Sequence, residues 1–159
     1  MTIQFSPIGI IHSPFKKPEG MPIQPEGAKG TRGQVEIFSE FVDGLIDLER
    51  FSHITLLYHF HLSDGYNLTP IPFLDNVPHG VFSTRAPRRP NAIGMSTVKL
   101  MSIQDNILHI ENIDIVDGTP LIDIKPFFPD IDSPESVRTG WAEDVLKKMK
   151  YHKSDNRFK

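Results

Sequence analysis

Residues 96–113 read STVKLMSIQDNILHIENI, and this stretch decides the fold. Segments 96–103 and 107–113 are both strand candidates, rich in the apolar residues that pack well on a pleated surface. Only Gln104, Asp105 and Asn106 separate them, a short polar link that is typical of a β-hairpin. An antiparallel sheet is therefore the expected foundation of the core.

Other segments repeat the strand pattern on both sides of this hairpin. The further candidates are residues 8–11, 34–38, 53–62 and 121–124. The strongest in the first half is 53–62, in which Ile54, Leu56, Tyr58 and Phe60 share one face and the three histidines lie on the other with Thr55 and Leu57. Many short strands without alternating long helices favour a barrel or strongly curved sheet over a doubly wound α/β fold.

The intervening segments are expected to be loops, with one helix at the end. Residues 16–32 and 63–79 are rich in Gly and Pro and predict surface loops, while 44–51 could form one or two helical turns. The pattern of 141–151 is amphipathic and helical, and residues 152–159 are expected to fray. The predicted fold is a mainly β, single-domain barrel over roughly 3–132, with a terminal helix over roughly 138–151.

Composition limits the class of protein. A chain of 159 residues fits one domain, and the absence of cysteine excludes disulfides and thiolate chemistry. A net charge of -3 argues against a protein that coats nucleic acid through bulk charge. No segment resembles a signal peptide or a membrane span, so a cytoplasmic protein that does not enter membranes is expected.

The histidines of the 53–62 segment raise the question of a metal. His59 and His61 have the spacing of paired ligands, and Asp64 or His79 could supply a third. No second half of such a site is recognisable, so hydrogen-bonded histidines are favoured and no metal is predicted. The sequence also lacks the Gly-rich nucleotide loops, the nucleophile elbow and the HExxH motif.

Two polar segments are better candidates for a ligand site. Residues 84–94, TRAPRRPNAIG, hold three guanidinium groups between restricting prolines, an arrangement suited to carboxylate or phosphate. Residues 114–120, DIVDGTP, place a sharp turn between apolar strands, where backbone groups can meet a ligand. A solvated basic turn and a plain hairpin turn are the alternatives for each segment taken alone.

These segments together carry a resemblance to a known family. VFSTR (81–85), RPNAIGMS (89–96), DIVDGTP (114–120) and DIKP (123–126) are similar to motifs of the TsaA/TrmO family, as is IGIIHSP (8–14). The resemblance implies a β-barrel methyltransferase that uses S-adenosylmethionine, works as a homodimer and methylates N6 of N6-threonylcarbamoyladenosine beside the tRNA anticodon. The chain departs from the family pattern at His12 and Ile23, where basic residues are frequent.

The resemblance also implies site residues. The implied cofactor contacts are Pro22, Ile23, Gln24, His61, Leu62, Arg85, Met95, Asp117, Gly118, Thr119 and Pro120. The candidate contacts to the tRNA substrate are Arg88, Arg89, Asn91 and Lys125. Asp117 and His61 are the candidate proton acceptors in this chain, and the carboxylate of the substrate is a third. A non-catalytic S-adenosylmethionine sensor and a methyltransferase with another small or RNA substrate are the alternative functions.

Overall fold

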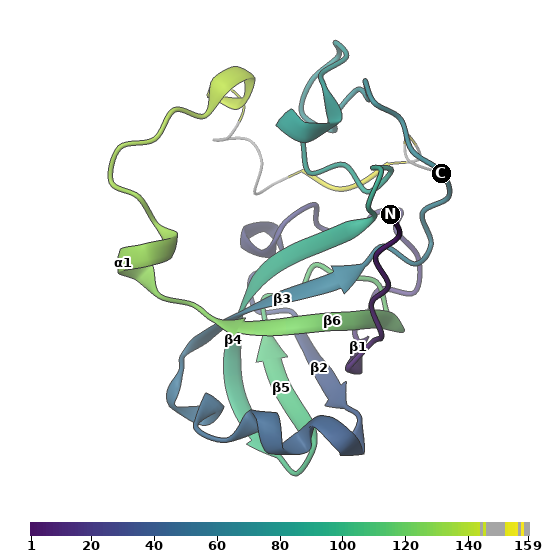
Figure 1. Cartoon of the computed structure of the whole chain (residues 1–159). Coiled ribbons are helices and arrows are strands. Elements are labelled where there is room, and N and C mark those ends of the chain that lie inside the picture. The colour runs from purple at the N-terminus through teal and green to yellow at the C-terminus, as the bar shows by residue number, and fades with distance from the viewer. Residues whose placement is uncertain (144, 146–151, 156, 158–159) are drawn as a thin grey trace.

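The computed structural model describes residues 1–143, 145, 152–155 and 157. In this part of the chain six strands close into a barrel in the order β1-β2-β5-β4-β3-β6 (Figure 1). The strands are β1 (Gly9–His12), β2 (Arg32–Ile37), β3 (His53–His59), β4 (Ile93–Gln104), β5 (Ile107–Glu111) and β6 (Thr119–Pro126). The expectation of a mainly β barrel is confirmed.

The core fills the inside of the barrel because apolar residues alternate along each strand. In β3 the burial pattern alternates, and Ile54, Leu56 and Tyr58 are buried as their spacing predicted. The same alternation buries Val98 of β4 and Leu108 of β5, both fully. Successive strand residues point to opposite faces, so one set of side chains is collected inside and the other faces outward.

Short irregularities let the sheet close. The β4–β5 hairpin turns at Asp105, which has φ 54, in the left-handed region that aspartate tolerates. The register shifts between Leu100 and Ser102 where β4 pairs with β5, and between Leu57 and Tyr58 where β3 pairs with β6. Such bulges bend a strand and increase its twist, which a six-stranded barrel requires.

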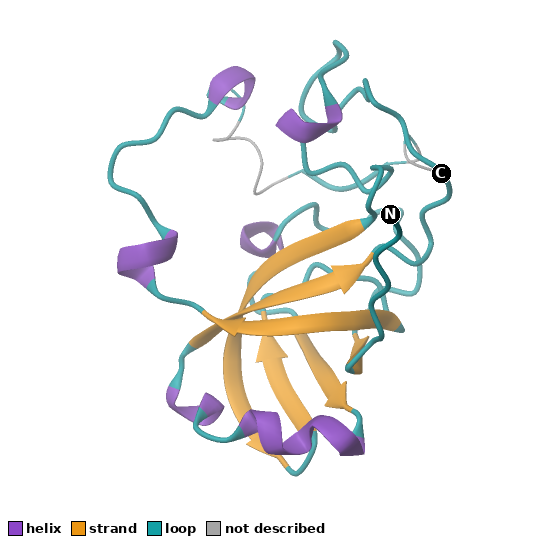
Figure 2. Cartoon of the chain, viewed as in Figure 1, coloured by secondary structure: helices purple, strands orange, loops and turns teal. Residues whose placement is uncertain are grey.

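The long connections all meet at one end of the barrel, the site end. Every neighbouring pair of strands is antiparallel, so residues 13–31, 60–92 and 112–118 emerge at the same rim. The opposite end carries the β4–β5 turn and the 3-10 turns η2 (Ser39–Leu45) and η3 (Leu48–Arg50) (Figure 2). The 3-10 turns over 39–50 agree with the helical turns expected over 44–51.

The C-terminal part differs from the expectation. After β6 comes one turn of helix, α1 (Pro129–Asp132), and later a 3-10 turn, η5 (Gly140–Ala142). Half of the helix predicted over 138–151 lies outside the described residues, and the described half holds only η5. No described helix has the length and apolarity needed to cross a membrane.

The expectation that residues 152–159 fray is wrong where the structure describes them. Lys153 forms an antiparallel bridge with Pro22, and the backbone N–H of Ser154 donates to the carbonyl of Met21 at 2.9 Å. A polar sequence gave no sign of this pairing, because the bonds are made by the backbone.

Gly94 is required by the packing of the barrel wall. It lies opposite Tyr58 in the β3–β4 register, and an added methyl group there would overlap the Tyr58 ring. Gly94→Ala is expected to destabilise the fold by about 1–3 kcal/mol, the range for overpacking in a core. Urea unfolding measures the loss. Gly44→Ala is the control, because nothing lies within 4 Å of the added methyl group; equal stability of the two variants would contradict the packing argument.

Candidate functional site

His61 stands where β3, β4 and β6 meet at the site end. The Thr119 hydroxyl donates to the carbonyl of Val116 at 2.6 Å, which uses its single hydrogen. The contact of Thr119 Oγ1 with His61 Nδ1, 3.3 Å, then has the imidazole N–H as donor. Partial burial and the neighbouring His59 lower the pKa of His61, so the ring is neutral at physiological pH. This tautomer leaves Nε2 as an open acceptor.

Asp117 is held in a fixed turn two residues before Thr119. One carboxylate oxygen accepts the Ser13 backbone N–H at 3.0 Å, and the other accepts Lys16 Nζ at 2.6 Å. Gly118 follows with φ 75, a conformation that suits glycine. The hydrogen bonds from Lys16 and Ser13 lower the pKa of Asp117, so the group is a persistent anion and a weak base.

A buried polar chain that the sequence did not reveal lies just inside the rim. The Ser96 hydroxyl donates to Asp114 Oδ1 at 2.7 Å, and the Tyr58 hydroxyl lies 3.1 Å from Ser96 Oγ. Because Ser96 gives its hydrogen to Asp114, the Tyr58 hydroxyl donates to Ser96. Burial raises the pKa of Asp114 to about 6 against the opposing effects of Ser96 and Arg85, and raises that of Tyr58 well above its usual range.

The sequence does carry a signal for Asp114. It opens the DIVDGTP motif and sits between Ile113 and Ile115, both buried. A carboxylate between two buried residues needs a partner, which Ser96 supplies from β4. The partner is distant in sequence, so the pairing emerges only once β4 and β5 are placed side by side.

The three arginines of the arginine-rich loop lie in different surroundings. Arg85 is exposed and acts electrostatically on Asp114 and Tyr58. Arg88 Nε donates to the Asp64 carbonyl at 3.0 Å, and Arg89 donates to the Thr84 carbonyl at 3.1 Å within its own loop. The restrained Arg89 therefore braces this loop.

The structure brings most of the other predicted contacts to the site end. Asn91 is exposed at the start of β4, and Leu62 is 56% and Met95 50% exposed near the same rim. Lys125 is separate, because it lies six residues beyond Thr119 along β6, roughly 20 Å at strand rise, and pairs with Asp123 at 2.8 Å. Pro22, Ile23 and Gln24 lie in the first loop, half-buried, with Pro22 bridged to Lys153.

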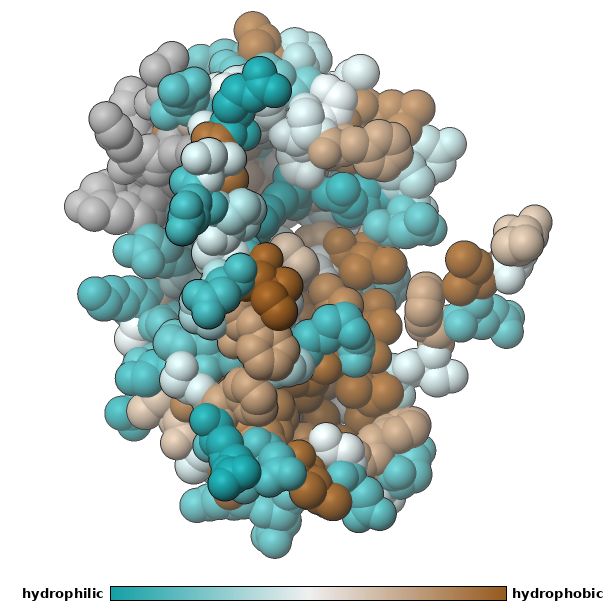
Figure 3. Space-filling model, turned by 60° about the vertical axis from the view of Figure 1, so that its left-hand side comes forward, coloured by the Kyte–Doolittle hydropathy of each residue, from teal (hydrophilic) through white to brown (hydrophobic). Residues whose placement is uncertain are grey.

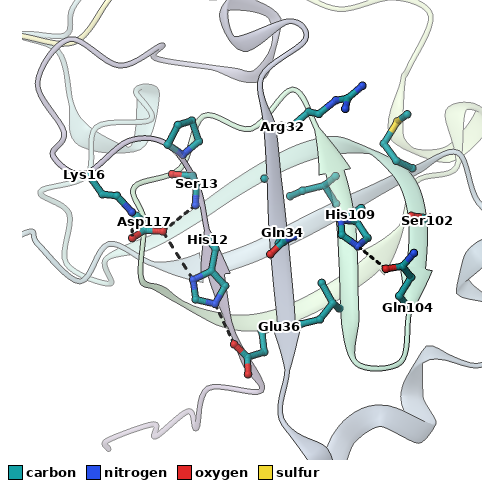
Figure 4. Close-up of a pocket in the computed structure, with 15 residues that line it drawn as sticks. His12, Ser13, Lys16, Arg32, Gln34, Glu36, Ser102, Gln104, His109 and Asp117 are labelled. Atoms are coloured by element: carbon teal, nitrogen blue, oxygen red, sulfur yellow. Dashed lines mark hydrogen bonds and ion pairs between the residues drawn. The ribbon is translucent and has the colours of Figure 1, made fainter.

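A hollow lies outside this rim. It measures about 1050 Å³ and spreads over the outer surfaces of β1, β2 and β5, with His12, Gln34 and His109 among its walls (Figure 4). His12 Nε2 lies 3.1 Å from Glu36 and its Nδ1 3.8 Å from Asp117, so the hollow touches the Asp117 turn at one edge. Across the described residues, no group of three or more His, Asp or Glu is arranged to hold a metal.

Comparison with known proteins places these features in context. Residues 10–133 match the family model of the tRNA-methyltransferase O N-terminal domain. A probable S-adenosyl-L-methionine-binding protein of Pyrococcus abyssi is 51% identical over 99% of this chain and 86% of its own length. The human tRNA (adenine(37)-N6)-methyltransferase is 38% identical over 86% of this chain, which spans 33% of that enzyme.

A solved structure agrees with the sequence matches. The crystal structure of TrmO from Pseudomonas aeruginosa superimposes with a TM-score of 0.76 at 39% identity. The alignment covers 90% of this chain and 64% of that one, so the chain corresponds to about two thirds of the solved protein.

The raised pKa of Asp114 makes a testable contribution to stability. A folded-state pKa of about 6, above the usual 3.8, favours the fold at low pH, and this contribution is lost as pH rises through 6. Asp114→Asn removes the cost of the buried charge, so at pH 8 the variant should be more stable than the wild type by up to about 3 kcal/mol. The advantage should vanish near pH 4. Urea unfolding at both pH values measures it, and a gap independent of pH contradicts the assignment.

Proposed function

The chain belongs to the tRNA-methyltransferase O family, and we propose on this premise that it is an S-adenosylmethionine-dependent tRNA methyltransferase. Its proposed target is N6 of N6-threonylcarbamoyladenosine next to the anticodon. The observation that carries the proposal is the meeting of His61, the Asp117 turn and the arginine loop at one end of the barrel. The arginine loop and the Asp117 turn contain the VFSTR, RPNAIGMS and DIVDGTP motifs of the family.

The residues at the site end fit S-adenosylmethionine chemically. The exposed guanidinium of Arg85 suits the cofactor's carboxylate, and the fixed anion of Asp117 suits a cation. Exposed Leu62 and Met95 offer apolar surface for a purine face. The bound cofactor supplies an activated methyl group on a sulfonium, so the protein has mainly to position two ligands and exclude water.

His61 is the proposed proton acceptor, in preference to Asp117. The N6 nitrogen must lose a proton as it gains the methyl group, and a positioned base assists this step. His61 is neutral with Nε2 open, whereas Asp117 is engaged by Lys16 and Ser13. Thr119, held by Val116, fixes the tautomer of the ring.

For the tRNA we propose that Arg88 and Asn91 contact the substrate from the exposed rim, with Arg89 bracing the loop that presents them. Arginines concentrated at one site let an acidic protein hold phosphate without a basic surface overall. Lys125, which lies far along β6, is proposed to contact a more distant part of the tRNA. Pro22, Ile23 and Gln24 are proposed to close over the cofactor from the first loop.

We further propose a cytoplasmic homodimer. Ile93, on the outer face of β4, is 38% exposed. Separately, apolar side chains gather in the middle of the face seen in Figure 3. Apolar surface of this kind, framed by polar residues, is typical of a protein interface. A second copy would bring a second arginine loop and widen the basic region available to tRNA.

The activity is tested with methyl-labelled S-adenosylmethionine and tRNA from a strain that lacks its own methyltransferase of this type. Label in N6-methylated threonylcarbamoyladenosine, found by nucleoside analysis, is the expected result. Cofactor binding without transfer to any RNA would support a sensor, and transfer to another nucleoside would change the substrate. If the protein does not bind S-adenosylmethionine, the proposed function is wrong.

His61→Ala is expected to lower kcat about 10²- to 10⁴-fold, the range for loss of a general base. His109→Ala on β5 is the matched control and should retain wild-type kcat. Because the pKa of His61 is lowered from its usual 6.5, the midpoint of the acidic fall in wild-type activity should lie below pH 6.5. If His61→Ala keeps the wild-type kcat, another group must accept the proton.

A further inference from the structure

The C-terminal segment returns from the far end of the barrel to the site end. Ser154 and Lys153 lie against the first loop, and Trp141 lies against the loop that precedes β4. Figure 1 shows the chain after β6 passing outside the barrel and coming back to the loops above it. Nothing in the family motifs includes these residues.

Ser154 binds the first loop through its backbone carbonyl, its backbone N–H and its side-chain hydroxyl. Its backbone carbonyl accepts the N–H of Gly20 at 2.9 Å, and its backbone N–H donates to Met21 at 2.9 Å. Its side-chain hydroxyl donates to the Pro18 carbonyl and accepts the Met21 N–H at 3.1 Å. One residue thus fixes the backbone on both sides of Gly20, which has φ 79.

The same segment also holds the second loop. Arg157 Nη1 donates to the Pro72 carbonyl at 2.5 Å, and its guanidinium lies 5.4 Å from the centre of the Phe73 ring. A cation at this distance from an aromatic face is attracted to it. Asp155 holds the guanidinium at 2.8 Å, so the contact is oriented.

Trp141 contacts the same connection, residues 60–92, nearer to β4. Its indole N–H donates to the Ser83 carbonyl at 2.8 Å, two residues before Arg85. Its ring stacks on His79 with centroids 4.4 Å apart and planes inclined by 19°. His79 is in turn paired with Asp75 at 2.8 Å. The C-terminal segment therefore contacts both the loop before β2 (13–31) and the loop before β4 (60–92). Both loops hold residues that are proposed to bind the cofactor.

We propose that Ser154 is a positioning residue of the methyl-donor site, which sets residues 20–22 so that Pro22, Ile23 and Gln24 are ordered before the cofactor binds. This inference rests on the proposed function. Residues 16–31 contain little regular structure beyond the short 3-10 turn η1 (Pro25–Ala28). Ordering a loop costs conformational entropy, and a loop already ordered by the fold binds its ligand more tightly.

Ser154→Ala tests the role of the hydroxyl while the backbone bridge is kept. The dissociation constant and KM for S-adenosylmethionine should rise roughly tenfold, the effect of one hydrogen-bonded group. The value of kcat at saturating cofactor should stay within about twofold, because Ser154 acts only on binding. Ser154→Thr keeps the hydroxyl and should restore the affinity. Ser133→Ala, an exposed serine next to α1, is the matched control and should bind as the wild type does.

Hydrogen exchange in the free protein supplies an independent measurement. The amide of Met21, which donates to the Ser154 hydroxyl, should exchange faster in Ser154→Ala than in the wild type and Ser133→Ala, while those of β3 and β5 should be unchanged. Unchanged exchange at Met21, or equal cofactor affinity of Ser154→Ala and the wild type, would overturn the positioning role. A wild-type chain that binds no cofactor would instead overturn the proposed function, so the two failures are distinct.

Discussion

β6 pairs with β1 along one edge and with β3 along the other, and this double pairing closes the barrel. Ile11 lies opposite Thr119, and Tyr58 lies opposite Leu121. Because both pairings are antiparallel, the end of β1, the end of β3 and the start of β6 meet at one rim. Segments more than fifty residues apart in the chain are thereby brought into hydrogen-bonding distance, as the contact of His61 with Thr119 shows.

Inside the closed barrel, the middle and the rim are filled by different kinds of side chain. The middle of the barrel is filled by fully buried aliphatic residues such as Ile54 and Leu108, which supply the hydrophobic stabilisation. At the rim the filling changes to the hydrogen-bonded Tyr58, Ser96 and Asp114. A buried carboxyl with a raised pKa costs stability at neutral pH, and such costs are typical of functional sites carried by an otherwise well-packed core.

The strands could be predicted because their signal is local. Alternation places Ile54, Leu56 and Tyr58 on one face whatever their partners are, and the structure buries all three. Strand ends were less predictable, since β4 begins at Ile93 and β6 at Thr119, each earlier than the apolar pattern indicates. Those extensions depend on pairing with β3 and β1, which no single segment reveals.

The motifs predict which residues belong to the candidate site, but they do not predict how those residues are paired. The motifs named Asp117 and Arg85, but the partners of Asp114 come from strands far away in the sequence. The pairing of Lys153 with Pro22 escaped prediction for a related reason, because backbone bonds leave no mark on side-chain pattern. Arg89 was predicted from its charge alone, and its bond to Thr84 within the same loop depends on the backbone path between them.

The two aspartates of the DIVDGTP motif show how strongly position outweighs composition. Asp114 and Asp117 are three residues apart, yet burial raises the pKa of the first to about 6, and hydrogen bonds from Lys16 and Ser13 lower that of the second. Asp114 follows β5 and accepts a hydrogen bond from Ser96 of β4, whereas Asp117 lies in the next turn and bonds to Ser13 and Lys16, so a step of three residues changes the surroundings of the carboxylate. The rim therefore presents a permanent anion at Asp117 and a neutral acceptor at His61, while the titratable carboxyl of Asp114 stays enclosed behind them. The proposed role of His61 as proton acceptor follows from this difference, because the carboxylate of Asp117 is already paired with Lys16.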